Sequence, residues 1–167
     1  MSFLHLKKIP NTSYQNYISG LEALNIKTDL HDPVDWHRLG VLYSNIPNDI
    51  IQTFNENTIL GNKGIIKQKI LLTNEDAFVA TPTRALVDLI FRIISSNDSN
   101  KDRNLQLLSG DIYNYFPSTK DRNNIASLLI QLINKNNDNQ LIDFFKQEMP
   151  KEFYKYKYEG ENYEYSE

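Results

Sequence analysis

The chain has 167 residues, a length that fits one domain of ordinary size and suffices to bury a core without disulfides. Its formal net charge is −3, so the molecule as a whole does not attract phosphate, and nucleic acid is not an expected partner. It contains no cysteine, which excludes disulfides, thiolate zinc sites and a cysteine nucleophile. Without a signal-peptide pattern or an apolar run of membrane-spanning length, we expect a cytoplasmic protein that makes no membrane contact.

The first part of the chain combines an irregular arm with one predicted helix. Residues 1–10 fit either a strand or a docked leader. From Thr12 to Asn25, apolar side chains recur at helical spacing, which predicts an amphipathic helix capped by Asn11 or Thr12. The dipeptide Asp32-Pro33 then breaks the chain.

The middle of the chain predicts short strands separated by turns. We expect a strand from Leu39 to Ser44, a short helix from Asp49 to Phe54 and a strand at Ile59-Leu60. After a turn at residues 61–64, alternating apolar residues predict a half-buried strand up to Leu72, and Ala77 to Ala80 reads as another strand. These strands are expected to form one small sheet.

The most apolar segment of the chain follows that last strand. Thr81 is a good N-cap, and Pro82 suits the first position of a helix. The residues from Ala85 to Ile94 are apolar on nearly all faces. Such a helix normally lies at the centre of its domain, so the Pro82–Ile94 helix is the predicted hub.

Three charged residues interrupt this helix at a spacing of four, and they therefore form one stripe: Arg84, Asp88 and Arg92. The favoured interpretation is an exposed stripe that solubilises one side, with an Arg84–Asp88 ion pair worth about 0.2–0.5 kcal/mol. A stripe inside the molecule would instead have to be paired and would then position the preceding turn. The same three residues are candidates for partner binding.

The final third of the chain is predicted to be helical. Apolar residues from Leu105 to Phe116 give one loose helical face, which Gly110 weakens and Pro117 ends. Ser118 caps the next helix, and a last helix begins at Asp138 and closes at Pro150.

These elements predict a mixed α/β fold in a single domain over residues 1–150. A small mixed sheet packs on the buried central helix, and the C-terminal third is helical. Residues 151–167 form an aromatic and acidic tail. It fits either a frayed terminus or an edge strand that presents tyrosines to a partner, namely Tyr154, Tyr156 and Tyr158.

The segment Val79-Ala80-Thr81-Pro82-Thr83-Arg84-Ala85-Leu86-Val87-Asp88-Leu89 resembles the (V)-A-T/S-P-E-R-A-L-L-D signature of AbiEi-type antitoxins, with Thr83 where the pattern usually has Glu. Ser19 to Leu24 is similar to a second stretch of that family, and a looser likeness extends over residues 19–133. The family belongs to bacterial type IV toxin–antitoxin, or abortive infection, systems. The resemblance implies an antitoxin that acts opposite a nucleotidyltransferase-like toxin encoded beside it.

We expect no cofactor and no catalysis by the protein itself. Members of the family commonly carry an N-terminal winged helix for DNA binding, and we expect none here because the front of the chain is too short for one. Consistent with a non-catalytic role, the sequence has no Gly-x-x-x-x-Gly-Lys-Ser/Thr phosphate loop and no Gly-x-Ser-x-Gly nucleophile.

Two other classes of function stay open. Gly61-Asn62-Lys63-Gly64 resembles the Gly-x-x-Gly loop of KH RNA-binding domains, so a nucleic-acid module would use Gly61, Lys63, Gly64, Lys67, Lys69 and the tail. A hairpin turn is the favoured interpretation of this loop, because the residues after it alternate like a strand. The other class is a non-catalytic subunit that docks on a larger partner.

A metal site is the last candidate. Residues 31–37 include two histidines and two aspartates, of which the candidate ligands are His31, Asp35 and His37. Their spacing matches no motif with a known mechanism, so a capped turn with Trp36 in the core is favoured and no metal is expected.

Overall fold

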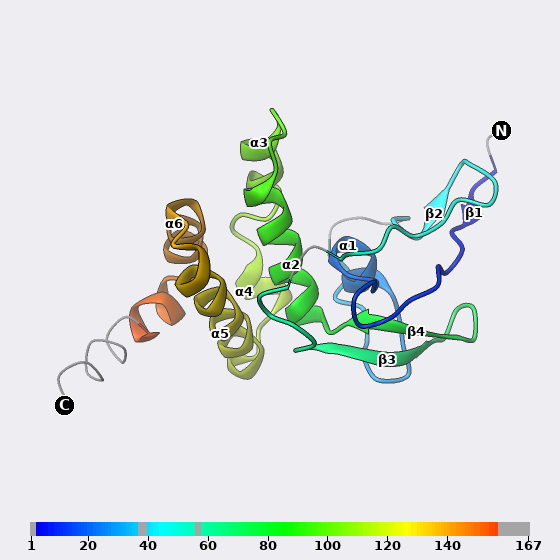
Figure 1. The fold of residues 1–167 in the computed structure, drawn as a ribbon, viewed down its shortest axis with the longest axis horizontal. Coiled ribbons are helices and arrows are strands. Elements are labelled where there is room, and N and C mark those ends of the chain that lie inside the picture. The colour runs from blue at the N-terminus through cyan, green and yellow to red at the C-terminus, as the bar shows by residue number, and fades with distance from the viewer. Residues whose placement is uncertain (1–2, 37–39, 56–57, 157–167) are drawn as a thin grey trace. The chain divides into compact units, whose positions relative to one another are not determined.

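The computed structural model describes residues 3–36, 40–55 and 58–156 (Figure 1). The chain divides into two compact units, Met1–Leu89 and a second that begins at Ile90. The predicted class is confirmed, because small antiparallel sheets precede a helical C-terminal part. The single domain expected over residues 1–150 stays a prediction. None of the helices described is long and apolar enough to cross a membrane.

The strands of the first unit form two separate antiparallel pairs and not the one small mixed sheet expected from the sequence. Strand β1 (His5–Leu6) pairs with β2 (Tyr43–Ser44), and β3 (Ile65–Ile70) pairs with β4 (Glu75–Ala80). An isolated parallel bridge between Ile18 and Val79 adds a further extended segment beside β4. The strand predicted from Leu39 is thus limited to Tyr43–Ser44, and Leu39 itself lies outside the described residues.

The first helix is much shorter than the predicted Thr12–Asn25, because α1 covers only Gly20–Asn25. Tyr17 and Ile18 are extended instead. The N–H of Tyr17 donates to the carbonyl of Phe54 at 3.1 Å, and the N–H of Ala80 donates to the carbonyl of Ile18 at 2.8 Å. Pairing with distant strands therefore outweighs the local helical pattern.

Two other elements predicted in the middle of the chain, a short helix and a short strand, are absent from the structure. Residues 49–54 are not helical, since Ile50 bridges to Lys8 and Phe54 bridges to Tyr17. Ile59 and Leu60 are not a strand but lead into the turn at residues 61–64, which is not a hairpin between two strands. In short apolar segments without strong helix caps, tertiary contacts readily outweigh the local preference for a helix or a strand.

The predicted central helix is present as α2 (Pro82–Ser95). The hydroxyl of Thr81 accepts from the backbone N–H of Arg84 at 3.4 Å, as expected of an N-cap. The buried apolar residues of this helix, each at most 2% exposed, are Ala85, Leu86, Val87, Ile90 and Ile94. The strand, Thr-Pro turn and buried helix were therefore predicted correctly.

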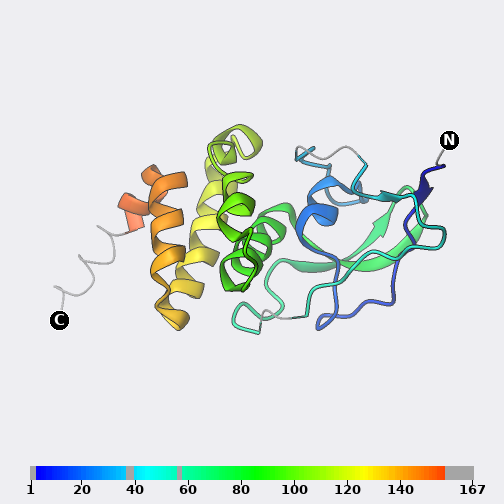
Figure 2. The same cartoon turned by 90° about the horizontal axis from the view of Figure 1, so that it is seen from above.

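The second unit is helical, with α3 (Lys101–Gln106), α4 (Ile112–Tyr115), α5 (Thr119–Asn136) and α6 (Asn139–Glu148). Helices α5 and α6 lie side by side (Figure 2). The N–H of Asp121 donates to the Ser118 hydroxyl at 3.4 Å, and Asp138 caps α6. Gly110, at φ +80°, separates α3 from α4, so the one loose helix predicted there is two short ones.

The start of the tail is helical. Pro150 does not end the helical region but begins a further helical stretch over residues 150–156. The edge-strand interpretation is therefore wrong for Tyr154 and Tyr156, because proline at a first helical position favours a new helix there. Tyr158 lies outside the described residues.

Candidate functional site: a buried ion-pair network at the start of helix α2

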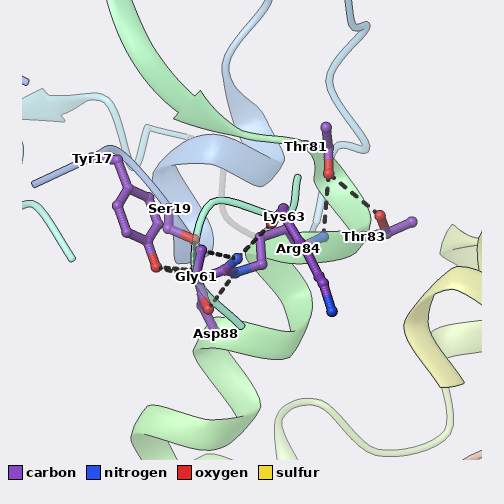
Figure 3. A network of polar contacts seen from close by, with 8 residues as sticks. All are labelled: Tyr17, Ser19, Gly61, Lys63, Thr81, Thr83, Arg84 and Asp88. Atoms are coloured by element: carbon purple, nitrogen blue, oxygen red, sulfur yellow. Dashed lines mark hydrogen bonds and ion pairs between the residues drawn. The ribbon is translucent and has the colours of Figure 1, made fainter. Parts of the chain in front are cut away.

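The first turns of α2 carry a salt bridge that is fully enclosed. Arg84 Nε lies 2.8 Å from Asp88 Oδ1, and neither side chain has exposed area. The two residues are one helical turn apart, so the helix itself brings them together. The exposed stripe favoured from the sequence is therefore wrong for these two residues, and the alternative of an internal pair is confirmed (Figure 3).

The carboxylate of Asp88 connects α2 to the segment before α1. Its Oδ2 accepts from the Tyr17 hydroxyl and from the Ser19 hydroxyl, both at 2.8 Å. Ser19 occupies the N-cap position of α1 but makes no side-chain cap there, because its hydroxyl is directed to Asp88. One carboxylate thus fixes the two residues that enter α1.

The guanidinium of Arg84 connects α2 to the turn at residues 61–64. Its NH1 group donates to the carbonyl oxygens of Gly61, at 2.9 Å, and of Lys63. Its NH2 group donates to the Tyr17 hydroxyl at 3.0 Å, and Cζ lies 5.5 Å from the centre of the Tyr17 ring. Arginine suits this role because its planar fork of donors reaches several acceptors at once.

The turn at residues 61–64 packs closely against the start of α2. Gly64 has φ +72°, and a Cβ built there would lie 2.8 Å from Arg84 Cβ and 3.0 Å from Thr81 Oγ1. The carbonyl of Gly64 also accepts from the N–H of Thr81 at 2.7 Å. Only glycine combines this backbone conformation with so close an approach.

Burial keeps Tyr17 protonated. Burial, followed by the negative charge of Asp88, raises the pKa of the Tyr17 hydroxyl far above its ordinary value of 10.0. Tyr17 therefore donates to Asp88 throughout the neutral range and well above it. Together with the Arg84 guanidinium it makes the buried negative charge tolerable.

The raised pKa of the Tyr17 hydroxyl predicts that the folded protein loses stability at alkaline pH. As the pH rises above about 10, the unfolded chain loses the Tyr17 proton while the folded chain retains it, so the free energy of unfolding falls. Tyr17→Phe is expected to weaken this fall, measured by urea unfolding at several pH values between about 8 and 11. Tyr43→Phe is the matched control for removal of a hydroxyl. A wild-type pH profile in Tyr17→Phe would contradict the assignment.

The nucleic-acid candidates have a different role from the one their sequence suggested. The backbone carbonyls of Gly61 and Lys63 serve Arg84, and Gly64 packs on α2. Lys67 and Lys69 are exposed on β3, but Asp76 is the cross-strand partner of Lys69, and the Asp29 carboxylate accepts from the Lys69 N–H. Acidic groups thus lie next to Lys69, which weakens its attraction to phosphate, whereas the cross-strand partner of Lys67 is Phe78.

The metal candidates do not form a site in the described chain. His31 Nδ1 lies 3.0 Å from Gln68 Oε1, an atom that also accepts from the Thr28 hydroxyl. Asp35 is exposed, and His37 lies outside the described residues. Among residues 3–36, 40–55 and 58–156, no group of three or more His, Cys, Asp or Glu is placed to hold a metal ion. Trp36 is 1% exposed, as the capped-turn interpretation predicted.

The remaining partner-binding candidates lie nearer the surface. Arg92 and Tyr156 are half-buried, whereas Tyr154 is 43% exposed. The Tyr156 hydroxyl donates to the carbonyl of Asn123 at 3.4 Å. Partner binding by these residues stays a prediction, and so does partner binding by Arg84 and Asp88, whose observed contacts are internal.

The second unit contains its own polar cluster, around Glu152. This carboxylate accepts from Arg122 Nε and from the Tyr113 hydroxyl, both at 2.8 Å. Burial and the hydrogen bond to Glu152 raise the pKa of Tyr113 to about 12. These contacts attach the helical stretch 150–156 to the rest of the unit, which again is a structural role.

A cleft of about 320 Å³ lies between α3 and α6 in the same unit. It is lined by side chains of mixed character: Asp102, Leu105, Gln106, Ser109, Gln140, Asp143, Phe144, Gln147 and Glu148. The Glu148 carboxylate is tied to the Gly110 N–H at 2.6 Å. The Ser109 hydroxyl in this lining donates to the carbonyl of Leu105 at 3.2 Å and not to one of the carboxylates, so no activated nucleophile is formed there.

Tyr17 and Ser19 are the members of the α2 network that sequence reasoning missed. The helical spacing of the apolar residues places both inside the predicted Thr12–Asn25 helix. The Ser19-Gly20 dipeptide was the available signal, because Gly20 adopts φ +62° and its missing Cβ would lie 2.8 Å from Phe54 Cζ. That glycine separates the extended segment from α1.

No family model, curated protein or solved structure matches the chain.

Proposed function

We propose that the chain is an antitoxin-like protein that neutralises a nucleotidyltransferase-type toxin of a bacterial type IV toxin–antitoxin or phage-defence system. The observation that supports this proposal is that the resemblance and the buried network share residues. Three residues of the signature that carries the resemblance, Thr81, Arg84 and Asp88, take part in the buried network at the start of α2. The network therefore supports the fold that the resemblance implies, and the antitoxin function follows from it by analogy.

The proposed mode of action is restraint by a non-catalytic protein. The network uses its charged groups to connect the segment at Tyr17–Ser19, the turn at Gly61–Lys63 and α2. We expect this buried ion pair to favour one arrangement of the segments it joins, which a binding surface requires. Tyr154, exposed on the last helical stretch, is the described tail residue best placed to contact the toxin.

The test is co-expression of the chain with the product of the adjacent gene in a bacterial host. The proposal expects that this neighbour is a nucleotidyltransferase whose toxicity disappears when the chain is present. Asp88→Asn is expected to abolish the rescue through loss of the fold, and Tyr154→Ala to weaken it at unchanged protein level. Unrelieved toxicity with wild-type chain at normal abundance would reject the proposal.

A further inference from the structure

Glu148 differs from the other buried acidic side chains of the described chain because it has no basic partner. The acidic residues that are buried are Asp88, Glu148 and Glu152. Asp88 and Glu152 each form an ion pair at 2.8 Å, with Arg84 Nε and Arg122 Nε respectively. Within the described ranges no lysine, arginine or histidine forms such a pair with Glu148, which is 9% exposed.

The contacts of Glu148 leave half of its carboxylate available. Its Oε2 accepts from the backbone N–H of Gly110 at 2.6 Å. Its Oε1 accepts from no described residue, yet it is not sealed off, because Thr73 Oγ1 is the described side-chain atom that is both enclosed and unbonded. A carboxylate largely removed from water without a counter-charge costs free energy, which a cation bound beside it would offset.

The cleft between α3 and α6, which Glu148 lines, suits a cation on an alkyl chain. Two further acids line it, Asp102 and Asp143, and neither is hydrogen-bonded or ion-paired within the described part of the chain. No basic side chain belongs to the lining. Lys101, beside Asp102 in sequence, donates to a glutamine amide at 2.6 Å instead. Leu105 and Phe144 offer apolar contact to an alkyl chain.

We propose that this cleft binds an organic cation, a guanidinium group on an alkyl chain, with its charge against Glu148. Among the described residues no group of acids is placed to hold a metal ion, which favours a planar cation whose N–H donors reach separate acceptors. The chain itself balances its two other buried carboxylates with guanidinium groups. The cleft volume of about 320 Å³ lies at the lower end of the roughly 300–1,000 Å³ typical of small-molecule sites. This inference goes beyond the proposed function and does not depend on it.

An NMR titration of the full chain with agmatine and with N-acetyl-arginine amide tests the site. At least one of them is expected to bind with a dissociation constant of about 1 mM or tighter at about 0.15 M salt. N-acetyl-citrulline amide, in which an uncharged urea replaces the guanidinium, is the matched ligand and is expected not to bind. Tighter binding of agmatine points to a free small molecule as the natural ligand, and tighter binding of the capped arginine points to an arginine side chain of a partner protein.

Glu148→Gln separates the proposed site from general attraction to an acidic protein. It keeps an oxygen for the Gly110 N–H and removes the charge, so it is expected to raise the dissociation constant at least about tenfold. Glu75→Gln, at an exposed position on β4, makes the same change in net charge and is expected to leave the constant unchanged. Absence of binding by both cations, or an equal loss in the two variants, would overturn the proposal.

Thermal unfolding without ligand checks that Glu148 lacks a partner inside the chain. Glu152→Gln breaks the ion pair with Arg122 and is expected to lower the thermal midpoint by about 5 °C or more. Glu148→Gln removes a charge that no basic group balances, so it is expected to leave the midpoint unchanged or to raise it. A fall as large as that of Glu152→Gln would overturn the proposal, because the Glu148 charge would then serve the fold.

Discussion

Replacing Asp88 by Asn is expected to lower the free energy of unfolding by about 3–5 kcal/mol. The substitution keeps the shape of the side chain and an oxygen that can accept from Tyr17 or Ser19. It leaves the Arg84 guanidinium without its counter-charge at a position with no exposed area. An uncompensated buried charge is among the most costly changes that a fold can suffer. Urea unfolding followed by circular dichroism measures the loss.

The same Asp→Asn change at an exposed position shows how much of the stability loss at Asp88 is due to burial of the ion pair. Asp143 is exposed on α6, so Asp143→Asn is expected to alter stability by no more than about 0.5 kcal/mol. Comparable losses in the two variants would mean that Asp88 is no more important than a surface carboxylate. That result would show that the buried network does not stabilise the fold.

Replacing Gly64 by Ala is expected to destabilise the protein by about 2–4 kcal/mol, because two costs add. The added Cβ enters a left-handed backbone conformation at φ +72°, and it would lie 2.8 Å from Arg84 Cβ. Relief of that contact requires movement of the turn that supplies the carbonyl acceptors of Arg84. The same unfolding measurement detects the loss.

Gly61 supplies the control within the same turn. It also has a positive φ, of +55°, but a Cβ there meets no atom within 4 Å. Gly61→Ala therefore isolates the backbone cost and is expected to lose only about 1 kcal/mol. Equal losses at the two glycines would show that the close packing of Gly64 on α2 contributes nothing.

The sequence predicted the parts of the fold whose signals are local. A strand that meets Thr81-Pro82 and an apolar run carries its cap, its start and its burial in consecutive residues, so α2 was predicted to within one residue at its end. Ser118 and Asp138 likewise stand where their helices begin. Strand β4 was identified from its short apolar run, which the structure extends back to Glu75.

The predictions from the sequence were wrong where contacts with distant segments determine the local structure. Tyr17 and Ile18 fit a helical spacing, but their backbone groups pair with Phe54 and β4. The spacing of Arg84 and Asp88 predicted an ion pair, whereas the backbone carbonyl and the tyrosine hydroxyl that bond to it come from segments more than 20 residues away in sequence. A spacing rule identifies neighbours on one helix and says nothing about what covers them.

A double-mutant cycle on Arg84 and Asp88 tests the central claim most directly, by measuring how far the two buried charges depend on each other. Arg84→Met and Asp88→Leu are each expected to cost about 3–5 kcal/mol, and the double substitution far less than their sum, because it removes both charges at once. A coupling energy of at least about 2 kcal/mol is the predicted result. Losses that add within about 0.5 kcal/mol would contradict the account.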